Sequence, residues 1–136
     1  MVLLCSVSIA KAQKKGDPKE KIKQLRVAFY TEELNLSVEE AQQFWPIFNK
    51  YSDQLETLER AMKDDHRKMK RASELTTEMV EEHIRNHSEM EATVAQLKKE
   101  FYLESSKVLD ANRTFLLTQL EKKFRKTLLK DFRGRP

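Results

Sequence analysis

Two histidines have the clearest capacity for chemistry in this sequence. His83 and His87 are four residues apart, which places both imidazoles on one face of a helix, with Met90 and Glu91 about one turn further on. Nitrogen ligands at this spacing suit zinc, copper or nickel. A tetrahedral site would need ligands from a second helix, and the competing interpretation is structural, with His87 partly buried and His83 in solvent. His83 and His87 are therefore candidate metal ligands only.

Signatures of catalysis are missing from the sequence. It contains no Gly-rich phosphate loop and no nucleophile motif, and its single cysteine, Cys5, lies in an apolar N-terminal segment. Carboxylates are abundant, but none stands in an apolar stretch that would raise its pKa. We predict that the protein is not an enzyme and that it uses no cofactor.

The N-terminal segment is typical of the end of a secretory signal peptide. An uncharged apolar run covers residues 2–10, and the small-x-small sequence Ala10-Lys11-Ala12 follows it. With about nine apolar residues, the run is too short to cross a bilayer core of roughly 30 Å. No Lys or Arg precedes it, which leaves a start further upstream, or a chance apolar end, as alternatives. We expect a signal peptide over residues 1–12.

Removal of this leader would leave a chain without cysteine. Small extracellular domains are usually cross-linked by disulfides, so a cysteine-free exported chain suits a periplasm better. We therefore expect a periplasmic protein that is not an integral membrane protein. The remaining sequence divides into a linker over residues 13–16 and a single helical domain over 17–133.

Helix boundaries stand out along that domain. The chain has only 2 Gly and 3 Pro in 136 residues, and 35% of its residues are charged, a composition typical of long helices. Asp17-Pro18 predicts a first helix that runs to about residue 34. Ser37 and Glu40 form a capping box that opens a second helix reaching about residue 72, with Pro46 expected to bend it.

The second half of the chain repeats this design. Thr76 or Thr77 caps a third helix that reaches about residue 103, and Leu109-Asp110 opens a fourth, in the same way as Leu36-Ser37 opens the second. The buried row of the third helix is predicted as Val80, Ile84, His87, Met90, Val94, Leu97 and Phe101. We predict an all-α fold of about four helices. A long, bent antiparallel hairpin forms its centre, and the first and last helices pack across it.

Two further features concern partners. Most aromatic residues near the start of the hairpin are expected in the core, but Trp45 lies beside the main apolar row, and Tyr30 lies on a second face of the first helix. Trp45 and Tyr30 are therefore candidate contacts for a partner or client. The net charge is +4, and basic residues gather in 63–71 and 122–135, where they could attract acidic or unfolded clients. Nucleic acid is a poor fit for an exported chain.

The helix starts carry a resemblance to a known family. Leu36, Ser37 and Glu40, with the run Phe-Trp-Pro-Ile-Phe-Asn-Lys-Tyr behind them, resemble the Leu-Thr-x-x-Gln (LTxxQ) motif of the Spy/CpxP periplasmic family, in particular its sensors of extracytoplasmic-function sigma factors. Leu109 and Asp110 resemble a second, degenerate copy. Here Ser and Glu replace Thr and Gln, but both still meet the capping requirement.

This resemblance implies a bent helical hairpin, often a homodimer, that takes part in the envelope stress response. Its partners would be unfolded proteins, as for an ATP-independent chaperone, or an envelope signalling protein. The alternative function is a metal-responsive sensor or metal-buffering protein that uses His83 and His87.

Overall fold

A computed structural model describes residues 16–134 of the chain. Within that range it contains four helices and no strand: α1 (Pro18–Leu34), α2 (Val38–Arg71), α3 (Thr77–Ser105) and α4 (Ala111–Arg133). The predicted all-α fold is thus confirmed. The predicted leader and residues 13–15 of the linker lie outside the described residues.

Local hydrogen bonds account for where the helices begin and end. The side chain of Asp17 accepts from the N–H of Lys19 at 3.1 Å, and that of Thr76 accepts from the N–H of Met79 at 3.2 Å. Asn35 ends α1 in the left-handed conformation, with φ 46°, which Asn tolerates better than most residues. Pro46 lies inside α2 without ending it.

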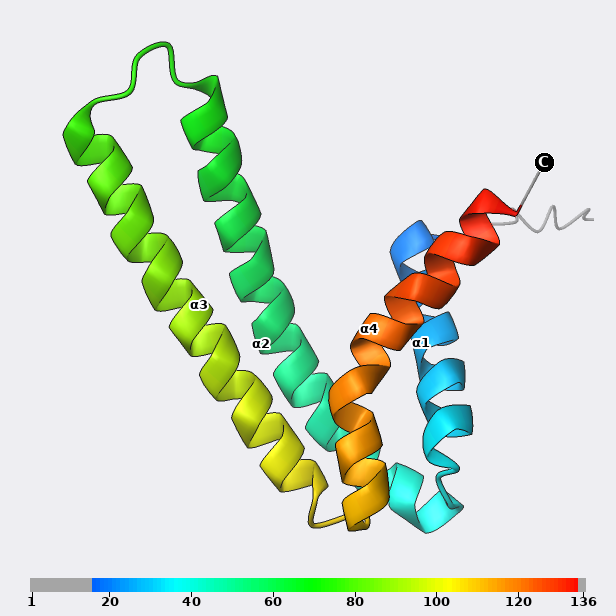
Figure 1. The fold of residues 1–136 in the computed structure, drawn as a ribbon. Helices are drawn as coiled ribbons and strands as arrows, with labels where there is room; N and C mark the ends of the chain where they lie inside the picture. The colour runs from blue at the N-terminus through cyan, green and yellow to red at the C-terminus, as the bar shows by residue number, and fades with distance from the viewer. Residues whose placement is uncertain (1–15, 135–136) are drawn as a thin grey trace, which may run out of the picture.

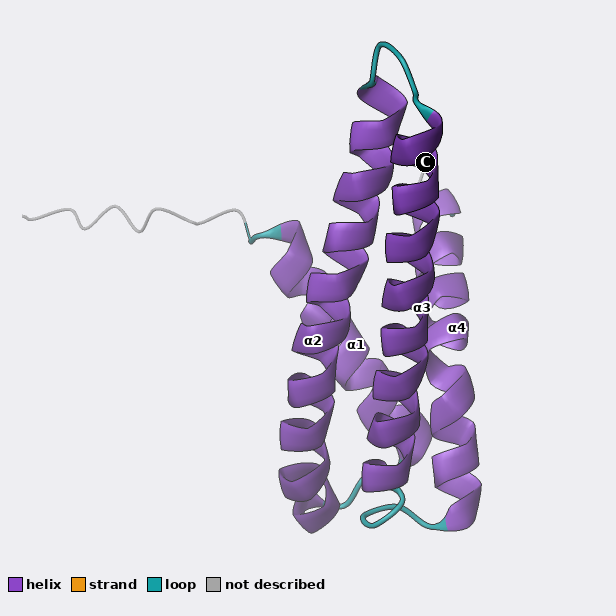
Figure 2. Ribbon diagram, turned by 90° about the vertical axis from the view of Figure 1, so that its left-hand side faces the viewer, coloured by secondary structure: helices purple, strands orange, loops and turns teal. Residues whose placement is uncertain are grey.

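The four helices form two arms that diverge from a common base (Figure 1). One arm is the long antiparallel hairpin of α2 and α3, and the other consists of α1 and α4, which also run antiparallel (Figure 2). The expectation that the first and last helices pack across the hairpin is therefore met only in part. They pack mainly on each other, and α4 touches α3 near the base.

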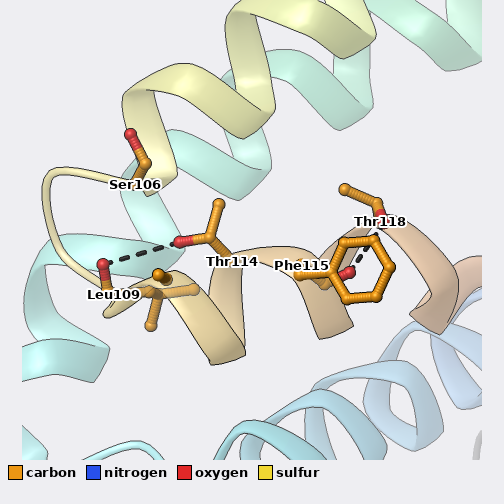
Figure 3. A pocket seen from close by; sticks show the side chains of 6 residues that line it. Ser106, Leu109, Thr114, Phe115 and Thr118 are labelled. Carbon is orange, nitrogen blue, oxygen red and sulfur yellow. Dashed lines mark hydrogen bonds between the residues drawn. The ribbon is translucent and has the colours of Figure 1, made fainter.

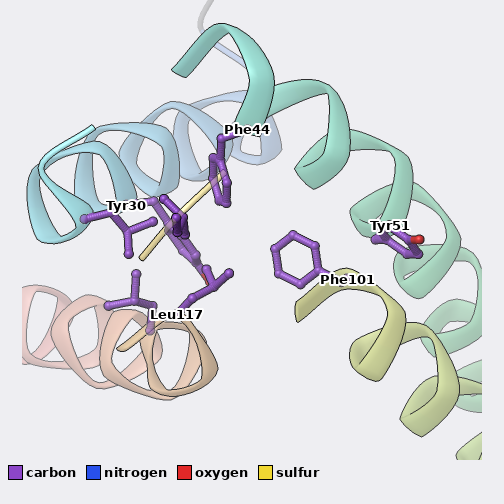
Figure 4. Packing of buried hydrophobic residues seen from close by; sticks show 8 residues of the cluster. Tyr30, Phe44, Tyr51, Phe101 and Leu117 are labelled. Carbon is purple, nitrogen blue, oxygen red and sulfur yellow. The ribbon is translucent and has the colours of Figure 1, made fainter. Parts of the chain in front are cut away.

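The core lies at the base, where all four helices meet. Phe44 is fully buried, and its ring lies 6.3 Å from that of Phe101, while Tyr30 lies 5.3 Å from Phe48. Figure 4 shows Tyr30 of α1, Phe44 of α2 and Leu117 of α4 grouped together, with Phe101 of α3 beside them and Tyr51 of α2 on the far side of Phe101. Aromatic pairs at these separations add stability beyond the area that they bury.

The distal part of the hairpin is packed differently. Between residues 52 and 100 no side chain is fully buried, and a half-buried seam joins α2 and α3. Met79 and His83 face this seam, while Val80 and Ile84 are exposed, so the predicted row of the third helix is wrong in its first two turns. The described helices include none that is both long enough and apolar enough to cross a membrane.

Candidate functional site

The principal hollow of the molecule lies between the two arms, and we call it the inter-arm cleft. It has a volume of about 800 Å³ and is lined by all four helices. Its floor is the surface of the core that faces the space between the arms, and most of the side chains there are aromatic. The floor consists of Tyr30, Phe48, Tyr51, Phe101, Tyr102 and Leu117.

A carboxylate, Glu121 of α4, organises one side of the floor. It accepts hydrogen bonds from the hydroxyl of Tyr30 at 3.0 Å, from Arg26 at 3.2 Å and from Arg125 at 3.2 Å. Burial, and then the negative charge of Glu121, raise the pKa of Tyr30 above its usual range. The same two causes raise the pKa of Tyr102. Both phenols therefore stay neutral, and they present apolar rings with one polar atom each.

The two walls of the cleft differ in charge. The α2 wall carries three acidic residues and no basic one, namely Asp53, Glu56 and Glu59. The opposite arm has an excess of basic side chains: Lys19, Lys23, Arg26, Lys122, Arg125 and Lys126 against Asp17, Glu20 and Glu121. One ion pair joins the walls, with Arg125 of α4 lying 4.0 Å from Glu59 of α2. An exposed pair at that distance contributes little stability, so it leaves the cleft open to a competing ligand.

The predicted capping box is present at the start of α2. The N–H of Glu40 donates to the hydroxyl of Ser37, and the N–H of Ser37 donates to the carboxylate of Glu40, both at 3.1 Å. The start of α4 is capped by Asp110, which accepts from the N–H of Arg113 at 2.9 Å. Leu36 packs against the core and Leu109 belongs to it.

The two helix starts meet at the base of the molecule. Arg113 donates to both carboxylate oxygens of Glu40, at 2.9 and 2.5 Å, and also to Asp110 at 2.7 Å and to the carbonyl of Leu34 at 3.3 Å. Such bidentate pairs fix orientation as well as distance. The Glu40–Arg113 pair therefore ties the start of α2 to the start of α4 and helps to set the angle between the arms.

The pKa of Glu40 reflects this arrangement. Its hydrogen bonds from Arg113, and next from the backbone of Ser37, lower its pKa from 4.5 to about 2. The pKa of Asp110 is lowered by the N–H and side chain of Arg113. No role was predicted for Arg113 from the sequence. The available signal was its position, three residues after the cap of α4, which corresponds to that of Glu40 in α2.

The two candidate partner contacts lie in different places. Tyr30 is only 3% exposed and forms part of the floor of the inter-arm cleft. Trp45 is half-buried and packs edge-to-face on Phe44 and Phe48, at 5.1 and 5.2 Å. Trp45 is not among the described residues that line the cleft.

The histidines lie on the distal hairpin, away from the cleft. The rings of His83 and His87 are 5.9 Å apart, but His83 bonds to Asp65 of α2 at 2.5 Å, and His87 bonds to Glu91 at 3.1 Å. The side chain of His83 is 22% exposed and that of His87 is 43% exposed, which reverses the burial expected from the sequence. Within residues 16–134, no group of three or more His, Cys, Asp or Glu side chains is arranged to hold a metal ion.

A second hollow of about 500 Å³ lies beside the turn between α3 and α4 (Figure 3). Its polar groups are already engaged, because Thr114 donates to the carbonyl of Leu109 at 3.5 Å and Thr118 to that of Phe115 at 2.7 Å. The rest of its lining is largely apolar and open to solvent. The inter-arm cleft is the better candidate for a binding site.

Comparison with known proteins gave no match. Family models, curated proteins and solved structures were all searched, and none matches this chain.

Proposed function

We propose that this protein is a periplasmic, stress-associated protein that binds unfolded or envelope partners in the inter-arm cleft without catalysis. The observation that carries the proposal is the construction of the cleft, with an aromatic floor between two charged walls. An apolar surface bordered by charge can hold partly unfolded chains, since it demands neither a fixed shape nor a fixed hydrogen-bond pattern.

The two helix starts support this proposal. Ser37 and Asp110 cap helices that begin at the base of the molecule, and their neighbours Glu40 and Arg113 join those helices. Paired helix starts of this kind are what the resemblance to the Spy/CpxP family would require, in which Leu36 and Leu109 mark the two motif copies. We propose membership of that family on these residues.

A non-catalytic role fits the charges inside the cleft. The carboxylate of Glu121 already accepts hydrogen bonds from two arginines and a tyrosine, so its oxygens are engaged within the protein. Tyr30, with its raised pKa, would release a proton only in strongly basic solution.

Aggregation of an unfolded model client, followed by light scattering with the protein near equimolar, tests the proposal. Suppression in the presence of chelator is the expected result. Suppression only after zinc is added would support the alternative, a metal-responsive protein acting through His83 and His87. No suppression in either condition would contradict general client binding and would favour a dedicated envelope signalling partner.

Export through a signal peptide and formation of a homodimer are two predictions with separate tests. A fusion of residues 1–16 to a reporter that is active only outside the cytoplasm should become active if residues 1–12 are a signal peptide. Val80 and Ile84 are exposed apolar side chains on the hairpin, which a second copy could cover in a homodimer. Light scattering coupled to size-exclusion chromatography measures the mass of the protein in solution and so distinguishes a dimer from a monomer.

A further inference from the structure

The floor of the inter-arm cleft offers a binding partner apolar contact but few hydrogen bonds. Tyr51 donates to Glu104 at 2.7 Å and Tyr30 donates to Glu121, so the hydroxyls of these two floor residues are already engaged. Phe48, Phe101 and Leu117 add no polar side-chain atoms, and Tyr102 adds a single hydroxyl. A partner must therefore present an apolar surface to the floor.

The walls of the cleft consist entirely of helices, and this restricts the backbone of the partner. Helices satisfy their own N–H and C=O groups, so α1, α2 and α4 have no free edge to which an extended strand could add. A peptide buried between them must satisfy its own backbone, and a helix does so. Such a helix would lie between the two arms, which diverge from the base (Figure 1).

The charges on the walls specify the flanks of that helix. Asp53 on α2 faces no cation within ion-pair distance among the described residues. On the other arm, the ammonium groups of Lys23, Lys122 and Lys126 likewise have no carboxylate partner within residues 16–134. These side chains border the cleft and keep their charges available for a ligand.

We propose that the inter-arm cleft binds an amphipathic helical segment with an apolar stripe and two oppositely charged flanks. The stripe lies on the aromatic floor, the basic flank faces the α2 wall, and the acidic flank faces α1 and α4. This inference rests on the proposed function and deepens it by stating which class of segment within a client or envelope partner is bound.

Three labelled peptides of about 18 residues, or five turns, test the inference by fluorescence anisotropy at low salt with the full chain. All share one Leu/Phe stripe. The first carries Lys on one flank and Glu on the other, the second carries Glu on both, and the third carries Lys on both. We expect the split-charge peptide to bind about fivefold more tightly than either of the others, and to gain helical circular dichroism when bound.

Reversing the α2 wall should change this preference. In Glu56→Lys/Glu59→Lys both walls are basic, so the peptide with two Glu flanks should become the tightest ligand. Glu82→Lys/Glu89→Lys makes the same change in net charge at exposed positions of α3 outside the cleft lining, and should keep the original preference. Circular dichroism of each variant shows whether it is folded, and the single variant Glu56→Lys replaces the double variant if that one is not.

The outcomes separate this inference from the proposed function. Equal affinities for the three peptides, an unchanged preference in Glu56→Lys/Glu59→Lys, or binding without helix formation would overturn the inference. If the protein still suppresses client aggregation, the proposed function stands and only the partner class fails. If aggregation is also unaffected, both fail.

Discussion

The base of the molecule and the distal half of its hairpin are built from the same kind of helix, yet they are stabilised to different degrees. At the base, four helices enclose Phe44, Leu117 and Leu120, which are almost completely buried. In the distal hairpin, two helices share a half-buried seam that contains the polar pair Asp65 and His83. Stability is therefore concentrated where the arms join, and the distal hairpin can open locally while the base stays intact.

This difference matters for the cleft, because its floor belongs to the base and its mouth to the arms. Tyr30 and Phe101 are fixed by the core, whereas Glu59 and Arg125 lie on helices that diverge from it. A rigid floor between movable walls would let the protein hold partners of different width. Four predictions test this comparison.

The largest effect is expected from removing an aromatic ring at the base. Phe44→Ala should lower the free energy of unfolding by about 3–5 kcal/mol, because the ring is completely buried. Met62→Ala, in the seam, should cost about 1 kcal/mol, because this side chain is only half-buried. Urea denaturation measures both, and Phe44→Leu serves if the alanine variant does not fold. Equal losses would contradict the comparison.

The Glu40–Arg113 pair should contribute more to stability than an ion pair within a single helix. Arg113→Ala leaves Glu40 without its bidentate partner at the base and should lower the melting temperature by roughly 5 °C or more. The matched control is Arg60→Ala, which breaks an exposed pair with Glu56 of 2.8 Å and should change the melting temperature by less than about 2 °C. A larger effect of Arg60→Ala would refute the role given to the pair.

Low pH should lower the stability of the four-helix base of the molecule, because it protonates Glu40. Because folding lowers the pKa of Glu40 from 4.5 to about 2, its contribution to stability is complete above about pH 4.5 and is lost as the pH falls towards 2. The stability difference between the native protein and Glu40→Gln should therefore be larger at about pH 7 than at about pH 3. Thermal unfolding of both proteins at the two pH values measures this stability difference. A difference that does not depend on pH would show that the charge of Glu40 is unimportant.

The smallest effect is expected in the seam of the hairpin. His83→Leu removes the partner of Asp65 and should speed amide hydrogen exchange in the distal turns of α2, while exchange at the base stays unchanged. The double variant Asp65→Leu/His83→Leu should restore slow exchange, because an apolar pair replaces a half-buried polar one at little cost. Faster exchange at the base in either variant would contradict the independence of the two regions.

The sequence predicts the local structure well, for a physical reason. A cap is a hydrogen bond between residues two or three positions apart, so Asp17, Ser37, Thr76 and Asp110 mark helix starts without reference to the rest of the fold. The four helix starts and the antiparallel hairpin follow from these signals. The divergence of the arms does not, because it depends on contacts between residues far apart in the chain.

The site shows the same division. The capping roles of Ser37 and Glu40 are local and were predicted, but the pair that Glu40 forms with Arg113 joins residues 73 positions apart. The position of His83 was predicted wrongly because Val80 and Ile84 are apolar and match the helical period, as Met79 and His83 also do. Short-range periodicity cannot choose between two such faces when the partner helix buries only one.

The central claim is that partners bind in the inter-arm cleft, and one paired measurement tests it most directly. Leu129 lines the cleft and is 57% exposed, while Leu103 lies on α3 outside the cleft lining and is 60% exposed. In the light-scattering assay, Leu129→Asp should require roughly threefold more protein for the same suppression of client aggregation, because a charge replaces apolar contact area. Leu103→Asp should behave like the native protein. Equal suppression by all three proteins, or loss in Leu103→Asp alone, would contradict the account.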